Sequence, residues 1–376
     1  VRTSSAKKDE PEWMLQFRLS ALETYHTRDM ASNWGPSITG LDMDHISTYV
    51  SPKTKQSNNW DDVPEDIRDT FERLGIPKAE AESLAGVGAQ YDSEIVYHNM
   101  RKEVAEQGVI YTTIEDALHD PKWEPVVKQY FGTLIPPADH KFAALHYAVW
   151  SGGSFVYVPA GVSLDYPLQS YFRLNAQGAG QFEHTLIIVE KGADLHFIEG
   201  CSAPKYYAAN LHAGAVELFV KDGARLRYST IENWSKNMYN LNTKRALVGS
   251  DARMEWVSGS IGSHVYNLYP STILNGDRSN CDFTGITFAG ATQDLDTGCK
   301  VIINGTDNTA SVDTKSISKD GGVNTFRSAV TIGSKAANAR VSVSCQSLML
   351  DDISRSDTIP EMDVRNATAQ VGLEAT

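Results

Sequence analysis

The side chains with the most reactive chemistry in this 376-residue chain are four cysteines: Cys201, Cys281, Cys299 and Cys345. They lie 80, 18 and 46 residues apart, so none forms the CxxC pair that is typical of zinc and redox sites. The ten histidines include no HExxH or HxH cluster. The spacing therefore argues against a zinc finger and a disulfide framework, and each thiol has to be judged by its position in the fold.

Several function classes are disfavoured by composition and by the motifs that the sequence lacks. The 47 acidic and 34 basic side chains give a net charge of −13, which does not suit a nucleic-acid partner. No GxGxxG, Walker A or GxSxG motif is present, so nucleotide hydrolysis is not expected from this chain. No apolar run has the length of a membrane span, and residues 1–30 do not resemble a signal peptide. We therefore expect a cytoplasmic protein with no membrane partner.

The elements that must position the cysteines fall into two parts with different periodicities. In the first part Asp9 is a candidate N-cap, and Leu19 and Leu22 follow at helical spacing. A second helix is predicted over 64–74. Shorter helices are expected over 78–85, 91–106, 121–131 and 141–150. Residues 1–150 are thus predicted to form a mainly helical N-terminal region.

From Gly152 the apolar period changes to two, and a degenerate repeat appears. A turn, a small residue and an alternating strand recur, with the small residues at Ala193, Ala224, Ala252, Ser279, Ala310 and Ala339. Such a repeat cannot bury its apolar face alone, so stacked coils are favoured. We predict a mainly β protein whose residues 151–376 form a right-handed parallel β-helix; a β-sandwich or jelly roll is the structural alternative. The side chains expected to point inward are Leu195, Leu226, Met254, Val312 and Val341.

Strand parity also assigns the cysteines to faces, because side chains two residues apart share one face. Cys201 and Cys345 are predicted to point into the solenoid, eight and six residues after the small residue of their repeats. Cys281 shares the core parity and is expected to be a buried structural thiol. Cys299 lies near a predicted turn, where it can be exposed, and is also expected to be structural.

Blocks along nearly the whole chain resemble the SufB/SufD family of iron–sulfur cluster assembly proteins, and in particular its SufB members. The matching blocks are 12–15, 60–67, 148–159, 171–175, 198–201, 233–235, 243–245 and 354–358. The resemblance implies a helical N-terminal region, a right-handed parallel β-helix and a C-terminal helical domain. That last domain docks an ABC-type ATPase subunit and is expected to be absent from this chain.

The resemblance also implies a role for particular residues. The chain is expected to be a scaffold rather than an enzyme, with Cys201 accepting persulfide sulfur and a nascent iron–sulfur cluster forming at Cys345 and Glu374. A polar sulfur path between them corresponds to Arg173, Asn175, Glu232, Trp234 and Lys244. Implied partners are a SufC-like ATPase, a SufD-like paralogue or a second copy of the chain, and a cysteine desulfurase with its sulfur-transfer protein. A flavin is a further cofactor that the resemblance allows.

Three positions depart from the family pattern. Glu232 stands where the family usually has Gln, His184 stands where Arg is common, and Leu373 replaces a His next to the ligand Glu374. Without the resemblance, Arg173 and Lys244 would be interpreted as solvated strand-edge charges and Trp234 as a core aromatic. Two alternatives stay open: a structural SufD-like subunit and a carbohydrate-active β-helix enzyme. Candidate acids for the enzyme are Asp294, Asp296, Asp313 and Asp320.

Overall fold

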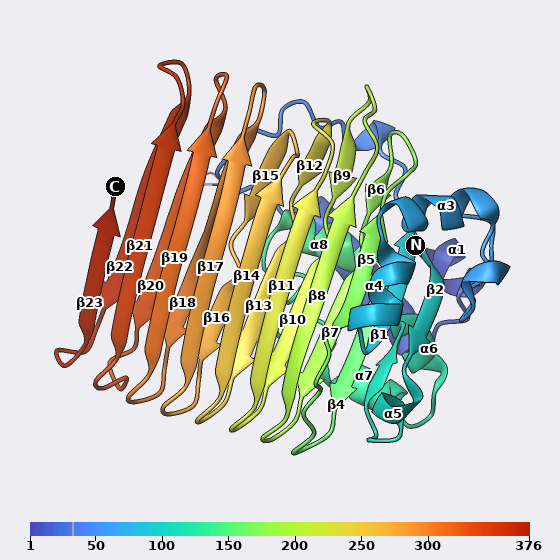
Figure 1. Cartoon of the computed structure of the whole chain (residues 1–376), viewed down its shortest axis with the longest axis horizontal. Coiled ribbons are helices and arrows are strands. Elements are labelled where there is room, and N and C mark those ends of the chain that lie inside the picture. Colours follow the sequence, from blue (N-terminus) through green and yellow to red (C-terminus); the bar gives the residue numbers. More distant parts are fainter. Residues whose placement is uncertain (32–33) are drawn as a thin grey trace.

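The computed structural model describes residues 1–31 and 34–376 and shows a long β-solenoid with helices at its N-terminal end (Figure 1). The helices are α1 (Arg2–Lys7), α2 (Glu12–Thr27), α3 (Glu65–Arg73), α4 (Ile76–Ser83), α5 (Lys102–Ala105), α6 (Ile114–His119), α7 (Glu124–Tyr130) and α8 (Lys141–Val149), with short 3-10 turns η1 (Met43–His45) and η2 (Trp60–Asp62). Within the described ranges, no helix has the length and apolar character needed to cross a bilayer. The predicted helical N-terminal region is therefore present.

The helix predicted over 91–106 is wrong, and only its last turn is helical, as α5. The segment instead forms β2 (Glu94–Met100), which pairs antiparallel with β1 (Gly86–Tyr91). Asp92, with φ of +54°, makes the tight turn between them. Strand pairing outweighs the helical pattern of this segment. Its partner β1 also forms a parallel ladder with β5 (Leu168–Arg173) and so becomes the first strand of one solenoid face.

Two sheets run the length of the solenoid, and their strands are parallel apart from the antiparallel pairs β1–β2 and β3–β4 at the N-terminal end. The sheet in front in Figure 1 has the order β2-β1-β5-β8-β11-β14-β17-β19-β21-β23. Its strands beyond β5 are β8 (Asp194–Ser202), β11 (Arg225–Asn233), β14 (Arg253–Ile261), β17 (Asn280–Ala289), β19 (Thr309–Ser318), β21 (Arg340–Met349) and β23 (Gln370–Ala375). Parallel pairing between successive coils confirms the β-solenoid and excludes the antiparallel sandwich.

The second sheet closes each coil from the other side. Its main ladder comprises β3 (Ile110–Thr112), β4 (Gly153–Val158), β7 (His184–Val189), β10 (Ala215–Val220), β13 (Thr243–Val248), β16 (Ser271–Leu274), β18 (Asp294–Ile303), β20 (Val323–Ile332) and β22 (Arg355–Val364). A shorter ladder joins it through β18 and comprises β6 (Gly180–Gln181), β9 (Asn210–His212), β12 (Met238–Asn240) and β15 (Val265–Leu268). Helices α2 and α8 pack together, and their apolar residues form one cluster with outward side chains of β4, β7 and β10. Helices α2 and α8 therefore cover the outer face of the second sheet at β4, β7 and β10.

The interior of the solenoid is built from the alternating residues that the sequence predicted. Leu195, Leu226, Met254, Val312 and Val341 are all at most 4% exposed and belong to one apolar cluster. One detail of the repeat is wrong: Asn308, not Ala310, lies in register with Ser279 and Ala339. The slip is two residues, so it leaves the inward parity of Val312 unchanged.

Candidate functional site

Two neighbouring columns of inward positions on the front sheet carry mostly polar side chains, next to the apolar columns of the same strands. Register alignment of β8, β11, β14, β17, β19 and β21 gives one column of Cys201, Glu232, Ser260, Thr287, Ser316 and Ser347 and a second of Glu199, Thr230, Ser258, Gly285, Thr314 and Cys345. We call these twelve positions the polar ladder. It connects the coil of Cys201 with the coil of Cys345.

The first end of the polar ladder is a buried cluster of acids around a thiol. Lys244 reaches across from β13 on the second sheet, and its Nζ donates to Glu199 Oε1 at 2.5 Å and to Thr230 Oγ1 at 3.0 Å. Glu232 Oε1 lies 3.8 Å from the same ammonium group. The Cys201 Sγ is 3.9 Å from Glu199 Oε1. All of these side chains are buried, so the cluster is shielded from water.

A second layer of hydrogen bonds holds the carboxylates of this cluster in place. Tyr228 donates its hydroxyl proton to Glu199, and Asn240 donates to Glu232 Oε2 at 2.6 Å. Asn240 is also hydrogen-bonded to His212, whose other ring nitrogen lies 2.5 Å from Glu183. Burial acts against the charged form of His212, but the contact with Glu183 outweighs it and raises the pKa to about 9. His212 is therefore a cation at neutral pH.

The electrostatics of the cluster keep Cys201 protonated at rest. Burial raises the pKa of the thiol well above its usual range, and Glu199 and Glu232 add to the rise while Lys244 opposes it. Burial acts against the ammonium form of Lys244, but the same two carboxylates outweigh it and raise the pKa of Lys244. Burial raises the pKa of the Glu232 carboxyl, and Lys244 counteracts this. Cys201 is 1% exposed, so an external reactant reaches its Sγ only through a local opening.

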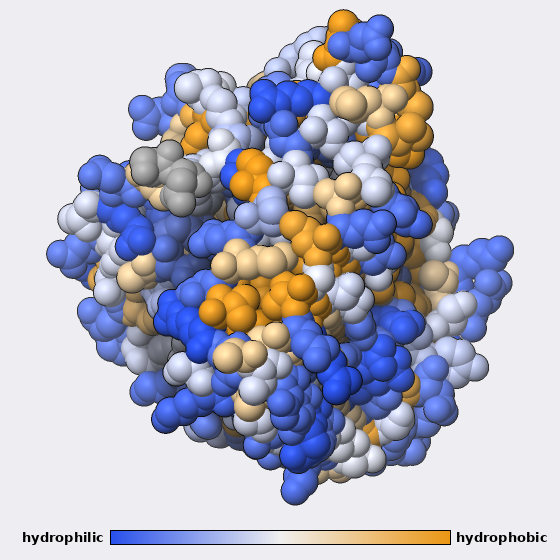
Figure 2. All heavy atoms as spheres, turned by 90° about the vertical axis from the view of Figure 1, so that its left-hand side faces the viewer, coloured by the Kyte–Doolittle hydropathy of each residue, from blue (hydrophilic) through white to orange (hydrophobic). Residues whose placement is uncertain are grey.

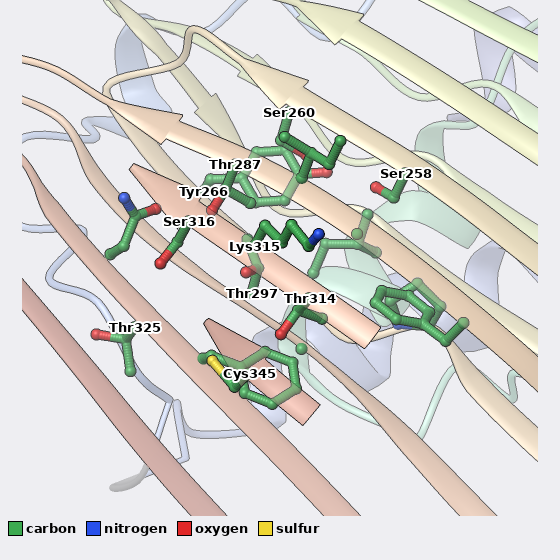
Figure 3. Close-up of a pocket in the computed structure, with 18 residues that line it drawn as sticks. Ser258, Ser260, Tyr266, Thr287, Thr297, Thr314, Lys315, Ser316, Thr325 and Cys345 are labelled. Carbon is green, nitrogen blue, oxygen red and sulfur yellow. The ribbon is translucent and has the colours of Figure 1, made fainter. Parts of the chain in front are cut away.

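The other end of the polar ladder is a small cavity beside Cys345. The Cys345 Sγ lies 3.6 Å from Thr358 Oγ1, which comes from β22 on the facing sheet. Figure 3 shows Cys345 at one end of a row of hydroxyl side chains that includes Thr314 and Ser316. The cavity volume is about 20 Å³, which is room for one water-sized guest.

The residues of the sulfur path that the family resemblance implies do not all lie in the buried cluster around Cys201. Trp234 is buried with its ring centroid 4.8 Å from that of His212. Arg173 lies at the rim, where Nη1 donates to Ser202 Oγ at 3.0 Å. Asn175 is also at the rim, and its backbone N–H donates to Asp92 Oδ1 at 2.6 Å. Lys244 and Glu232 therefore lie within the cluster, whereas Arg173 and Asn175 lie next to its outer edge.

Glu374 is the family-implied ligand that the structure places away from its thiol. It lies in register with Ser344, so its side chain leaves the outer face of the sheet, whereas Cys345 points inward. Leu373 is in register with Val343 and shares the inward parity of Cys345. The position that carries leucine in place of the family's histidine is thus on the thiol's side of the strand.

Three other expectations from the sequence can be compared with the observed surroundings of Cys299, Lys244 and Asp296. Cys299 is 3% exposed in the middle of β18, so the prediction that it lies near an exposed turn is wrong. Lys244 is a buried ion-pair partner and not a strand-edge charge. Asp296, one candidate acid of the carbohydrate alternative, is bound to Arg327 at 2.8 Å, which is a structural ion pair.

Sequence reasoning missed Glu199 and the hydroxyl residues of the polar ladder. A signal for them exists, because polar side chains recur six and eight residues after the aligned start of the repeats, with Gly285 as the exception. Glu199 follows Ala193 at six, as Thr230 follows Ala224. A polar residue repeated at an inward position is costly unless it has partners, and it therefore marks a functional candidate.

The fold and the site define a class of protein: a parallel β-solenoid that buries a thiol–acid–lysine cluster and joins it to a second thiol by polar side chains. Residues 172–376 match the SufBD core domain of the SUF system of FeS cluster assembly. An iron–sulfur cluster assembly SufBD family protein of Staphylococcus saprophyticus is 47% identical over 375 residues, covering 100% of this chain and 80% of that protein. Such a protein of Staphylococcus aureus strain MRSA252 is 47% identical over 374 residues, covering 100% of this chain and 79% of that protein. The chain belongs to the SufBD family of iron–sulfur cluster assembly proteins.

Proposed function

We propose that this chain is the SufB-type scaffold of a cytoplasmic assembly complex, in which Cys201 accepts sulfur and Cys345 holds the growing cluster. The observation that supports this most strongly is the polar ladder, which has one thiol at each end. A SufD-like structural subunit would need neither thiol. The buried charges of the cluster are also difficult to explain as a stabilising device, because an apolar replacement is often as stable.

Sulfur acceptance is a thiol exchange at Cys201. After its proton is removed, the thiolate attacks the terminal sulfur of a donor persulfide and forms a Cys201 persulfide, and the donor leaves as a thiolate. No net oxidation occurs in this step. The proton can pass to Glu199, whose Oε1 lies 3.9 Å from the Cys201 Sγ, while Lys244 stabilises the anionic sulfur.

The two thiols are too far apart for direct exchange. They are separated by five strand steps along the front sheet, roughly 24 Å at about 4.8 Å per strand. Sulfur therefore travels in a released form, and release of sulfide from a persulfide consumes two electrons, which an added dithiol supplies. The hydroxyl groups of the polar ladder can donate to an anionic sulfide along the way. The cavity of about 20 Å³ at Cys345 is too small for a flavin ring, and we derive no step through a flavin.

At the second end, the cluster needs ligands besides Cys345. Glu374 becomes one only if β23 shifts, because its carboxylate now leaves the opposite face. Leucine at 373 cannot bind iron, so we infer that a partner supplies a further ligand, a histidine. The growing cluster is the substrate of this site, and the site gains its full set of ligands when another subunit assembles with the chain.

An apolar surface at this end fits such a partner. Figure 2 shows apolar side chains gathered on the face at the left of Figure 1, where β21, β22 and β23 lie. Its exposed members are Leu348, Met349, Leu350, Ile353, Ile359, Met362, Val364 and Leu373. We infer that a SufD-like paralogue or a second copy of the chain packs here. A SufC-like ATPase and a cysteine desulfurase with its sulfur-transfer protein complete the proposed complex.

Persulfide labelling followed by anaerobic cluster reconstitution tests the proposal. The purified chain receives sulfur from a desulfurase, and labelling is expected at Cys201 and to be absent in Cys201→Ser. Thr314→Val removes a polar-ladder hydroxyl and should leave labelling intact while slowing cluster formation at Cys345. Cys281→Ser, a buried thiol outside the polar ladder, is the matched control. Undiminished labelling of Cys201→Ser, or equal cluster formation in Cys345→Ser, would show that the assignment is wrong.

A further inference from the structure

The side chains of Glu199, Cys201 and Glu232 converge closely enough to bind one metal ion. One ligand atom from each lies within 4.8 Å of the others, and all three side chains are buried. Glu199 and Cys201 are two residues apart on β8, and Glu232 is in register with Cys201 on β11. A first-row divalent ion binds oxygen at about 2.1 Å and sulfur at about 2.3 Å, so it spans donors roughly 3.5–4 Å apart. The observed separation of Cys201 Sγ and Glu199 Oε1 is 3.9 Å.

One carboxylate oxygen in this cluster has no hydrogen-bond partner. Glu232 is 1% exposed, and its Oε1 is a buried atom without a donor, whereas Oε2 accepts from Asn240. The oxygen faces the interior of the cluster, where the Lys244 ammonium lies 3.8 Å away. Buried acceptors are almost always satisfied, so this oxygen has room for a further partner, which a water molecule or a metal ion would supply.

The charges of the cluster define the competition that a metal ion would meet. Three buried carboxylates, Glu183, Glu199 and Glu232, face two cationic side chains, Lys244 and His212. Lys244 Nζ lies near both Glu199 Oε1 and Glu232 Oε1, so its ammonium group occupies the place of a cation between them. A metal ion would have to compete with Lys244 for these oxygens.

We propose that Glu199, Cys201 and Glu232 form a loading site for ferrous iron, so that iron and sulfur both enter at this end of the polar ladder. The proposal rests on the scaffold function above. A thiolate with two carboxylates suits a first-row divalent metal, whereas magnesium and calcium prefer oxygen alone. As the metal–sulfur bond forms, the Cys201 thiol proton leaves to the buffer and no electron is transferred.

Anaerobic titration of the purified chain with Co²⁺ alone tests the site, because cobalt bound to a thiolate gives a near-ultraviolet charge-transfer band. The parent chain should develop this band, and added Fe²⁺ should reduce it by competition. Cys201→Ser should abolish the band, and Glu232→Gln should weaken Co²⁺ binding by about tenfold or more. Cys281→Ser should titrate like the parent. A band that survives in Cys201→Ser, is lost only in Cys345→Ser, or is unaffected by Fe²⁺ overturns the proposal.

A second measurement separates this proposal from the sulfur-transfer function. Persulfide labelling of the parent chain in metal-free buffer tests the sulfur-acceptor role, whereas Co²⁺ titration of Glu232→Gln tests the metal site. If Glu232→Gln binds Co²⁺ as tightly as the parent, the metal site is wrong whatever the labelling shows. If parent Cys201 is not labelled but gives the cobalt band, the metal site stands and the sulfur-acceptor role fails.

Discussion

Replacing Lys244 by methionine should be among the most destabilising single changes in the interior. Met has nearly the same length and is apolar, so the substitution removes the charge with little change in packing. It leaves Glu199 without the ammonium donor at 2.5 Å and Thr230 Oγ1 without its donor at 3.0 Å. It also leaves Glu232 without the cation at 3.8 Å. Breaking a buried ion pair on one side costs about 3–5 kcal/mol, because the remaining charge is uncompensated.

Equilibrium urea unfolding measures this loss as a lower midpoint at unchanged slope. The double variant Lys244→Met/Glu199→Gln removes the stranded carboxylate as well and should recover at least about 2 kcal/mol of the loss. Lys300→Met, on the exposed face of β18, is the matched control and should change the free energy of unfolding by less than about 0.5 kcal/mol. A loss below about 1 kcal/mol in Lys244→Met, or no recovery in the double variant, would refute the interpretation of this cluster as an ion-paired core.

Three further predictions concern the core, the pH dependence and the second thiol. Met254→Ala should cost about 2–5 kcal/mol in urea unfolding, because Met254 is fully buried in the solenoid core; a loss under about 1 kcal/mol contradicts this. His212, held by Glu183, has a folded-state pKa of about 9 against about 6.5 in the unfolded chain. Its protonation therefore stabilises the fold fully below pH 6.5, and about 3 kcal/mol of the free energy of unfolding is lost as the pH rises through 9. His212→Gln should flatten that decline, and an unchanged pH slope would show that another group causes it. Leu373→His should raise cluster occupancy in anaerobic reconstitution, since position 373 shares the inward parity of Cys345; equal iron and sulfide content in both proteins counts against a cluster there.

The fold class and the inward direction of the key thiols were determined by the sequence itself. Alternation with period two is a local property of each strand, so the parity of Cys201, Cys345 and Met254 followed from their neighbours alone. The repeat predicted stacked coils because one coil cannot bury its own apolar face. The same parity carried a signal for Thr230 and Ser260 that becomes clear only when the repeats are aligned.

Only the tertiary structure decided which coils face each other in which register, and therefore which charges meet. The place of Asn308 in the ladder depends on hydrogen bonds between neighbouring coils, and the sequence pattern alone misplaced it by two residues. Lys244 meets Glu199 from the opposite sheet, 45 positions along the chain, and no local spacing predicts that contact. Strand β2 formed where a helix was expected because pairing with β1 outweighed local propensity. Pairing across the lumen and between coils is set by long-range packing, which the residue pattern of one segment does not contain.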